Sequence, residues 1–329
     1  MFRRLLPLIG AAVLSLAGPA AADLRAETFA SPALARDINA NVYVPAGDPP
    51  PNGWPVLYLL HGHDGNQNSW RDLGSILPTL DRLIDEARIQ PLVVVMPDGG
   101  NSWYVDSAAL GGPGDYETAL TRDLRLAVEG RYPVRKDREG RAIAGLSMGG
   151  YGALRLAYAH NDLYVAAASL SGAIWQNIAA PNLDLSPEQL LVVQQSLSFS
   201  NPKSWAVTSG IVLPSVGDHF SGAFGRPFDA ERFNEANVFT LVDRAVAANR
   251  PLPVSYITAG DDDGYRLWRG AVVLHETLQQ ARRSSELRIT DGQHVWALWE
   301  RTIVDALLFL DRQWLPTAYP QPAVAPPKP

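Results

Sequence analysis

The stretch Arg141-Ala-Ile-Ala-Gly-Leu-Ser-Met-Gly-Gly-Tyr-Gly-Ala-Leu154 decides the fold. It starts as a short apolar strand and continues, after Ser147, as the first turns of a helix. Between the two, Gly145-Leu146-Ser147-Met148-Gly149 matches Gly-x-Ser-x-Gly, in which a serine occupies a sharp strand-to-helix turn. Residues two before and two after that serine crowd each other, so both are glycine. The pattern predicts a nucleophilic serine at a helix N-terminus, where the helix dipole favours negative charge; a plain glycine-rich turn is the alternative.

Elsewhere the chain alternates short apolar runs with helical patterns. Residues 38–44 alternate apolar and polar side chains, which is typical of a half-exposed strand. Runs that suit strands buried on both faces of a parallel sheet occupy residues 55–60, 91–96, 141–145, 166–170, 253–258 and 286–290. Helical patterns occupy residues 116–129, 149–159 and 265–283, and a last helix places Trp299, Ile303, Ala306, Leu307, Leu310 and Trp314 on one face. This order predicts an α/β fold, with a mainly parallel central sheet flanked by helices.

The N-terminus has the features of a cleaved signal peptide. Arg3 and Arg4 precede an apolar stretch at residues 5–16, and Ala20-Ala21-Ala22 offers small residues for cleavage before Asp23. A membrane anchor is the alternative, but the stretch is shorter than the ~20 residues that a spanning helix needs. We therefore expect residues 1–22 to be removed from an exported protein, periplasmic or secreted, without stable membrane insertion.

Two other segments depart from the alternation of strands and helices. Residues 316–329 hold six prolines in fourteen residues, which indicates a disordered tail. Residues 174–250 are far longer than an ordinary crossover and include a helical pattern at 187–197. We expect a cap-like insertion within a single domain at 23–315; a lengthened surface loop is the alternative.

Composition excludes several classes of function. The chain has 28 Lys and Arg against 34 Asp and Glu, a net charge of -6, and no basic run. Nucleic-acid binding requires clustered cations, so no nucleic-acid partner is expected. The absence of cysteine rules out disulfides, thiolate metal sites and a cysteine nucleophile.

A nucleophilic serine needs a histidine as its base. The chain has six: His61, His63, His160, His219, His275 and His294. Only His294 directly follows the last predicted strand, which is where the catalytic base lies in folds with this kind of sheet. His160 ends the helix after Ser147, where a cation commonly plays a structural role.

The third catalytic group must orient the imidazole, and it should follow the strand at 253–258. Three candidates stand in a row: Asp261, Asp262 and Asp263. Residue chemistry alone leaves all three open. In each case the chain order is Ser, Asp, His, the order expected of α/β-hydrolases.

Two backbone N–H groups must stabilise the oxyanion. Met148, directly after the serine, supplies one. His63, in the loop after the strand that ends at Leu60, is the expected second donor, and Gly62 lets this loop turn inward. A metal on His61 and His63 is a weak alternative, because a third ligand is poorly placed.

These residues resemble the Putative esterase (esterase D-like) family of α/β-hydrolases. That family includes S-formylglutathione hydrolases, feruloyl and acetylxylan esterases, enterochelin esterases and the antigen 85 mycolyltransferases. The resemblance rests on stretches 59–62, 96–104, 116–118, 142–154, 169–172, 260–263 and 294–296. The family pattern Gly-x-x-Asp, laid on Gly260, places the triad acid at Asp263. It also implies that residues 98–100 shape the floor of the site, with Trp103 and Tyr104 nearby.

The departures from that family favour an ordinary esterase. The antigen 85 enzymes have Glu where this chain has Asp, and a small residue replaces their second elbow glycine. The export signal argues against the role of the cytosolic S-formylglutathione hydrolases. The segment 174–250 matches no member and should determine the choice of substrate.

We therefore expect an exported serine carboxylester hydrolase that uses Ser147, His294 and Asp263, with Met148 and His63 at the oxyanion and no cofactor or metal. Substrate-binding candidates are Trp103, Tyr104, Trp175 and Trp296, although each could instead be core packing. The expected partner is a small-molecule or carbohydrate ester. The alternatives are an acyltransferase with a sugar or alcohol acceptor and a non-catalytic binding protein on a hydrolase scaffold.

Overall fold

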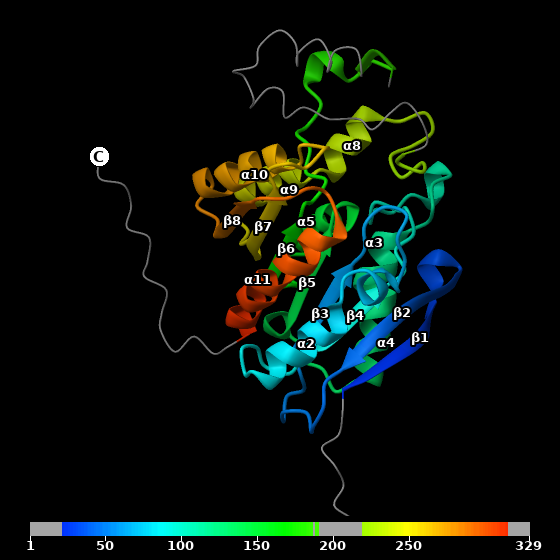
Figure 1. Cartoon of the computed structure of the whole chain (residues 1–329). Helices are drawn as coiled ribbons and strands as arrows, with labels where there is room; N and C mark the ends of the chain where they lie inside the picture. Colours follow the sequence, from blue (N-terminus) through cyan, green and yellow to red (C-terminus); the bar gives the residue numbers. More distant parts are fainter. Residues whose placement is uncertain (1–21, 187, 191–218, 315–329) are drawn as a thin grey trace, which may run out of the picture.

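The computed structural model describes residues 22–186, 188–190 and 219–314, which form one eight-stranded sheet (Figure 1). The strand order is β1-β2-β4-β3-β5-β6-β7-β8. β1 and β2 are antiparallel to their neighbours, and all pairings from β4 to β8 are parallel. The bounds are β1 Asp23–Ser31, β2 Arg36–Val44, β3 Val56–Leu60, β4 Val93–Pro97, β5 Arg141–Leu146, β6 Ala166–Leu170, β7 Val254–Gly260 and β8 Ser285–Thr290. The expected mainly parallel α/β sheet is confirmed.

Helices cover both faces of the sheet (Figure 1). Besides four short 3-10 helices, the helical elements of the described residues are α1 Ser69–Asp72, α2 Ile76–Asp85, α3 Tyr116–Thr118, the π-helical η3 Ala119–Leu124, α4 Arg125–Arg131, α5 Met148–Ala159, α8 Ala230–Ala236, α9 Val238–Ala247, α10 Trp268–Gln280 and α11 Trp296–Trp314. Side chains of α2 and α11 pack in one hydrophobic cluster with Val94 and Met96 of β4. Those of η3, α4, α5, α9 and α10 pack in another with Val93 and Val95. This alternation along β4 shows that the strand is buried on both faces.

The sequence patterns misjudge the two ends of the sheet. β1 was not predicted, because its residues are mostly exposed and carry little apolar signal; it pairs with β2 from Asp23 opposite Val44 to Ser31 opposite Arg36. The expectation that residues 286–290 are buried on both faces is wrong. β8 is the opposite edge strand, and its side chains are only partly buried or exposed. An edge strand has one neighbour, so it can carry Glu286 and Arg288 at little cost.

The helices differ from expectation mainly in their bounds. The segment expected as one helix at 116–129 forms α3, η3 and α4 in succession. α2 was not predicted, although Ile76, Leu80 and Leu83 are buried on one face at helical spacing. α10 begins at Trp268 because the residues before it belong to the loop that carries Asp263.

The described parts of segment 174–250 are continuous with the main core. Trp175, Phe224, Phe233 and Val242 are buried in the same cluster as α5. The Tyr151 hydroxyl of α5 donates a hydrogen bond to the carbonyl of Ala236 at 3.0 Å. The expected helix at 187–197 lies outside the described residues except for 188–190, as do the expected tail and, except for residue 22, the expected signal peptide. None of the helices in the described ranges is long and apolar enough to cross a membrane.

Candidate active site

Ser147 occupies a strained turn between β5 and α5. Its φ of 53° and ψ of -119° lie outside the usual regions for a residue with a side chain. A Cβ on Gly145 would lie 2.3 Å from the Gly149 carbonyl oxygen, and a Cβ on Gly149 would lie 2.4 Å from that of His61. Both positions therefore require glycine. The turn leaves the Ser147 side chain partly exposed above the sheet.

His294 links the serine to a buried carboxylate. Its Nε2 lies 3.0 Å from Ser147 Oγ, and its Nδ1 lies 2.8 Å from Asp263 Oδ2. An ionised carboxylate only accepts hydrogen bonds, so Nδ1 carries the proton and Nε2 is free to accept one from Ser147. Asp263 is 3% exposed, and its Oδ1 accepts a hydrogen bond from the N–H of Tyr265 at 2.8 Å. Both carboxylate oxygens are thus fixed.

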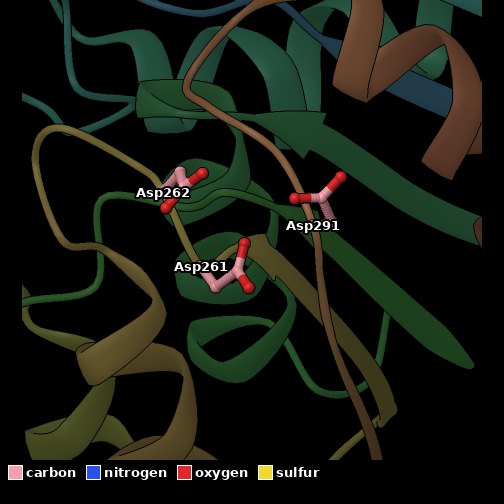
Figure 2. A group of neighbouring side chains, drawn as sticks. All are labelled: Asp261, Asp262 and Asp291. Carbon is pink, nitrogen blue, oxygen red and sulfur yellow. The ribbon is translucent and has the colours of Figure 1, made fainter.

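The other two aspartates of this loop face solvent. Figure 2 shows Asp261 and Asp262 after β7 and Asp291 after β8. One carboxylate oxygen of each residue lies within 4.8 Å of those of the other two. All three are exposed. The Asp261 carboxylate accepts a hydrogen bond from the N–H of Gly292 at 3.2 Å, which ties the acid loop to the loop that carries His294. Of the three neighbouring candidates, the geometry brings Asp263 alone to the imidazole.

The two residues expected to donate to the oxyanion line the same cavity as Ser147. Met148 is the first residue of α5, so its N–H has no acceptor in a preceding helical turn. The backbone of Gly62 approaches closely, since a Cβ there would lie 3.3 Å from Ser147 Cβ. Gly62, His63 and Met148 all line the same cavity as Ser147 and His294. The arrangement suits an oxyanion between the two loops.

The rings of His61 and His63 are engaged by the protein. His61 Nδ1 donates to the carbonyl of Gly62 at 2.7 Å, and Nε2 accepts from the N–H of Gly99 at 2.8 Å. Burial lowers the pKa of His61, which keeps this ring neutral. His63 Nε2 donates to the carbonyl of His219 at 3.0 Å, and the two rings stack at 4.6 Å. These contacts give both histidines a structural role, which does not favour the metal alternative.

A cavity of about 420 Å³ surrounds Ser147 and His294. Three of the four predicted substrate-binding aromatic residues line it: Trp103, Trp175 and Trp296. The prediction for Tyr104 is wrong. Trp103 and Tyr104 both have positive φ, and the Tyr104 side chain is fully buried, with its hydroxyl bonded to the carbonyl of His61 at 2.8 Å.

Sequence reasoning missed several lining residues. Tyr265 and Trp299 place their rings edge-on to the His294 imidazole, at centroid distances of 5.0 Å and 4.9 Å. Leu73, which is 55% exposed, also lines the cavity. Tyr265 lies two residues after Asp263, which was a usable signal, whereas Trp299 lies on the predicted core face of the last helix. Among the described lining residues none is Lys or Arg.

A second carboxylate–histidine pair lies at the C-terminal end of α5. His160 Nε2 is 2.8 Å from Glu117 Oε1, and Arg155 donates to the other oxygen of Glu117. Burial alone would raise the pKa of Glu117, but the hydrogen bonds and charges of His160 and Arg155 outweigh it and lower the pKa to about 2. His160 follows α5 directly, as expected for a structural helix end.

The sheet, the turn at Ser147 and the order serine, aspartate, histidine define an α/β-hydrolase fold with a Ser-His-Asp constellation. A family model described as "Putative esterase" matches residues 31–310. The chain therefore belongs to this esterase family. The expected family is confirmed.

Relatives of the chain share part of its length. An esterase of Mycobacterium tuberculosis (Esterase MT1326) is 32% identical over 145 residues, which are 40% of this chain and 30% of the relative. A diacylglycerol acyltransferase/mycolyltransferase of Mycobacterium avium (Ag85B) is 34% identical over 129 residues, 36% of each chain. The matches thus span about a third of these relatives' own lengths.

Solved structures extend the likeness to most of the chain. A ferulic acid esterase superposes with a TM-score of 0.66 at 21% identity, covering 89% of this chain and 99% of the other. At that level of identity, the likeness concerns the fold.

Proposed function

We propose that the protein is an exported serine carboxylester hydrolase that forms an acyl-enzyme on Ser147. The observation that carries the proposal is the continuous hydrogen-bond chain from Ser147 Oγ through His294 to the buried Asp263. The serine is partly exposed in a cavity, so an ester can reach it. Membership of the esterase family supports the same reaction class.

The reaction follows from the positions of the side chains. Ser147 Oγ attacks the ester carbonyl carbon while His294 Nε2 takes its proton, and the N–H groups of Met148 and His63 stabilise the oxyanion. Asp263 holds the imidazole and stabilises its cation. When the carbon–oxygen bond breaks, His294 returns the proton to the leaving alcohol. Water then attacks the acyl carbon while His294 Nε2 takes its proton; when the bond from that carbon to Ser147 Oγ breaks, His294 returns the proton to Oγ and the acid is released.

The cavity suits an uncharged ester with an apolar or aromatic part. Trp103, Trp175 and Trp296 provide flat apolar surfaces beside the serine. The described lining residues include no Lys or Arg, so they offer no cation to pair with an anionic substrate. A small-molecule or carbohydrate ester is the substrate class we propose, without a cofactor. Segment 174–250, which contributes Trp175 and His219 to the lining, acts as a cap within the single domain.

Export is part of the proposal and rests on residues 1–22, with Arg3-Arg4 before an apolar stretch and the alanines at 20–22. The mature protein would begin at Asp23, the first residue of β1. N-terminal sequencing of protein recovered from the periplasm or medium tests this. Recovery of the full-length chain, retained in the cytoplasm or the membrane, would contradict export.

An acyltransferase that uses the same acyl-enzyme is the second candidate, favoured by the similarity to the Ag85B mycolyltransferase. The two reactions differ only in whether water or an alcohol accepts the acyl group. A competition assay in water with added sugar or alcohol acceptors separates them. Products that are predominantly transferred esters would favour the second candidate.

A panel of chromogenic esters of increasing acyl length, with feruloyl and acetylated-xylan substrates, tests the main proposal. We expect Ser147→Ala to lower the turnover rate by roughly four to six orders of magnitude without unfolding the protein. Ser69→Ala, which changes another serine of the cavity lining, is the matched control and should stay within about tenfold of wild type. A fully active Ser147→Ala variant would overturn the assignment.

A further inference from the structure

The Tyr104 ring packs between the backbone of α5 and that of the loop that contains Gly99. A Cβ on Gly152 of α5 would lie 2.3 Å from Tyr104 Cδ2, and one on Gly99 would lie 2.5 Å from Tyr104 Cε1. Only glycine fits at either position. The fully buried ring therefore separates helix α5, which begins beside Ser147, from the loop that contains Gly99.

The hydroxyl of Tyr104 fixes the first peptide of the oxyanion loop. It donates a hydrogen bond of 2.8 Å to the carbonyl of His61, which belongs to the His61–Gly62 peptide. The ring of His61 fixes the next peptide, because its Nδ1 donates to the carbonyl of Gly62 at 2.7 Å. Gly99, against which Tyr104 packs, holds that ring from the other side through its N–H.

The direction of the His63 N–H follows from these contacts. In a trans peptide the N–H points opposite to the C=O of the same unit. The Gly62 carbonyl accepts from the His61 ring and also from the N–H of Gly65 at 3.1 Å. With that carbonyl held by two donors, the N–H of His63 points to the opposite side of the peptide, and Gly62 of the same peptide lies close to Ser147.

The backbone of Tyr104 is itself held in place. Its φ of 56° is unfavourable for a residue with a side chain, so surrounding contacts must maintain it. Arg155 of α5 donates to the carbonyl of Tyr104 at 3.1 Å and is paired with Glu117. A partly buried ion pair thus anchors the tyrosine to the same helix that follows the nucleophile.

We propose that Tyr104 is a positioning residue, whose hydroxyl sets the oxyanion loop and thereby the alignment of the His63 N–H with the reacting carbonyl. The inference rests on the proposed function, since it assumes that this N–H stabilises the oxyanion. It assigns to Tyr104 a role in catalysis without contact with substrate. Misplacing such a donor slows the reaction while leaving ground-state binding largely intact, because the donor acts mainly on the transition state.

Tyr104→Phe removes only the hydroxyl. Its matched control is Tyr158→Phe, which removes a buried hydroxyl on α5. That hydroxyl is hydrogen-bonded to Ser255 Oγ at 2.8 Å, and neither residue lines the cavity. Both variants lose one buried hydrogen bond, so their thermal midpoints should fall by similar amounts. We expect Tyr104→Phe alone to lower kcat, by roughly tenfold to a hundredfold, with little change in KM.

Two further measurements separate positioning from general loosening. Inactivation of Ser147 by a fluorophosphonate should slow in Tyr104→Phe in parallel with kcat/KM, because the phosphoryl oxygen occupies the same hole. The pH dependence of kcat/KM should keep its midpoint, because the His294–Asp263 pair is not altered. Should Tyr104→Phe fold poorly, His61→Asn and His61→Leu provide the test. The asparagine can still donate to the Gly62 carbonyl, so kcat should fall less than in the leucine variant.

A kcat in Tyr104→Phe equal to that of Tyr158→Phe would overturn this inference alone, as would equal losses in the two His61 variants. A rise in KM without a fall in kcat would also overturn it, because that result would indicate substrate contact. A wild-type protein without esterase activity, or without labelling of Ser147, would overturn the proposed function and this inference with it.

Discussion

Two carboxylate–histidine pairs of equal length lie near opposite ends of α5, one beside Ser147 at its start and one at His160, directly after its last residue. His294 Nδ1 is 2.8 Å from Asp263, and His160 Nε2 is 2.8 Å from Glu117. In the first pair, the second ring nitrogen faces Ser147 in a cavity. In the second pair, the carboxylate is shared with Arg155, and the pair does not line the cavity.

The difference shows what makes such a pair catalytic. Asp263 accepts from the imidazole and a backbone N–H, so its charge is left to stabilise an imidazolium. Glu117 is neutralised by a guanidinium, and its strongly lowered pKa reflects a structural anchor. A carboxylate beside a histidine is therefore not a site in itself; the group at the other ring nitrogen decides.

Exchanging each histidine for glutamine gives the largest contrast between the pairs. We expect His294→Gln to lower kcat by roughly four to six orders of magnitude, because no base remains for Ser147. His160→Gln keeps a donor toward Glu117 and should leave kcat/KM within about threefold of wild type. Steady-state kinetics on one small ester measures both. Similar losses in the two variants would show that the comparison is wrong.

The three neighbouring aspartates sharpen the assignment of the acid. Asp263→Asn keeps the shape but favours the wrong imidazole tautomer, so turnover should fall by about four orders of magnitude. Asp261→Asn and Asp262→Asn change exposed carboxylates and should stay near wild type. The three variants are compared by kcat at neutral pH. A normal rate in Asp263→Asn with a loss in a neighbour would move the acid within the loop.

The structural pair has its own signature in the pH dependence of stability. The pKa of Glu117 is about 2 in the folded protein, against an ordinary value of 4.5. A lowered pKa means that the stabilisation is complete above the unfolded value and is lost as the pH falls toward the folded one. The stability advantage of wild type over Glu117→Gln should therefore shrink by roughly 2 kcal/mol between about pH 6 and pH 3.

Urea unfolding of the two proteins across that range measures the change. An advantage that stays constant, or grows on acidification, would contradict the lowered pKa. For the catalytic pair, the comparison of wild type with Asp263→Asn measures turnover and not stability.

Local sequence patterns predicted the parts of the site that depend on local geometry. The two glycines around Ser147 and the strand before it predicted the turn, and the position of His294 after the last strand predicted its approach. Asp263 required the family pattern, because Asp261, Asp262 and Asp263 are chemically alike. Only the fold shows that Asp263 is buried while the other two face solvent.

The errors arise where a side chain's direction depends on distant contacts. Trp103 and Tyr104 are neighbours with similar chemistry, yet one ring lines the cavity and the other packs between Gly99 and Gly152. No local pattern shows this, because Gly99 lies in the loop after β4 and Gly152 lies in α5, far away in the sequence. Likewise, the place of β8 at the edge is set by the order of the whole sheet, although Glu286 and Arg288 already distinguish it from the apolar buried strands.

Peptide mass spectrometry after fluorophosphonate labelling shows directly whether Ser147 is the nucleophile. We expect one adduct, on Ser147, whose formation abolishes ester hydrolysis and which is lost in Ser147→Ala. Labelling should be much slower in His294→Gln but not in His160→Gln. An adduct on another residue, or loss of esterase activity in protein that remains unlabelled at Ser147, would contradict the assignment of Ser147.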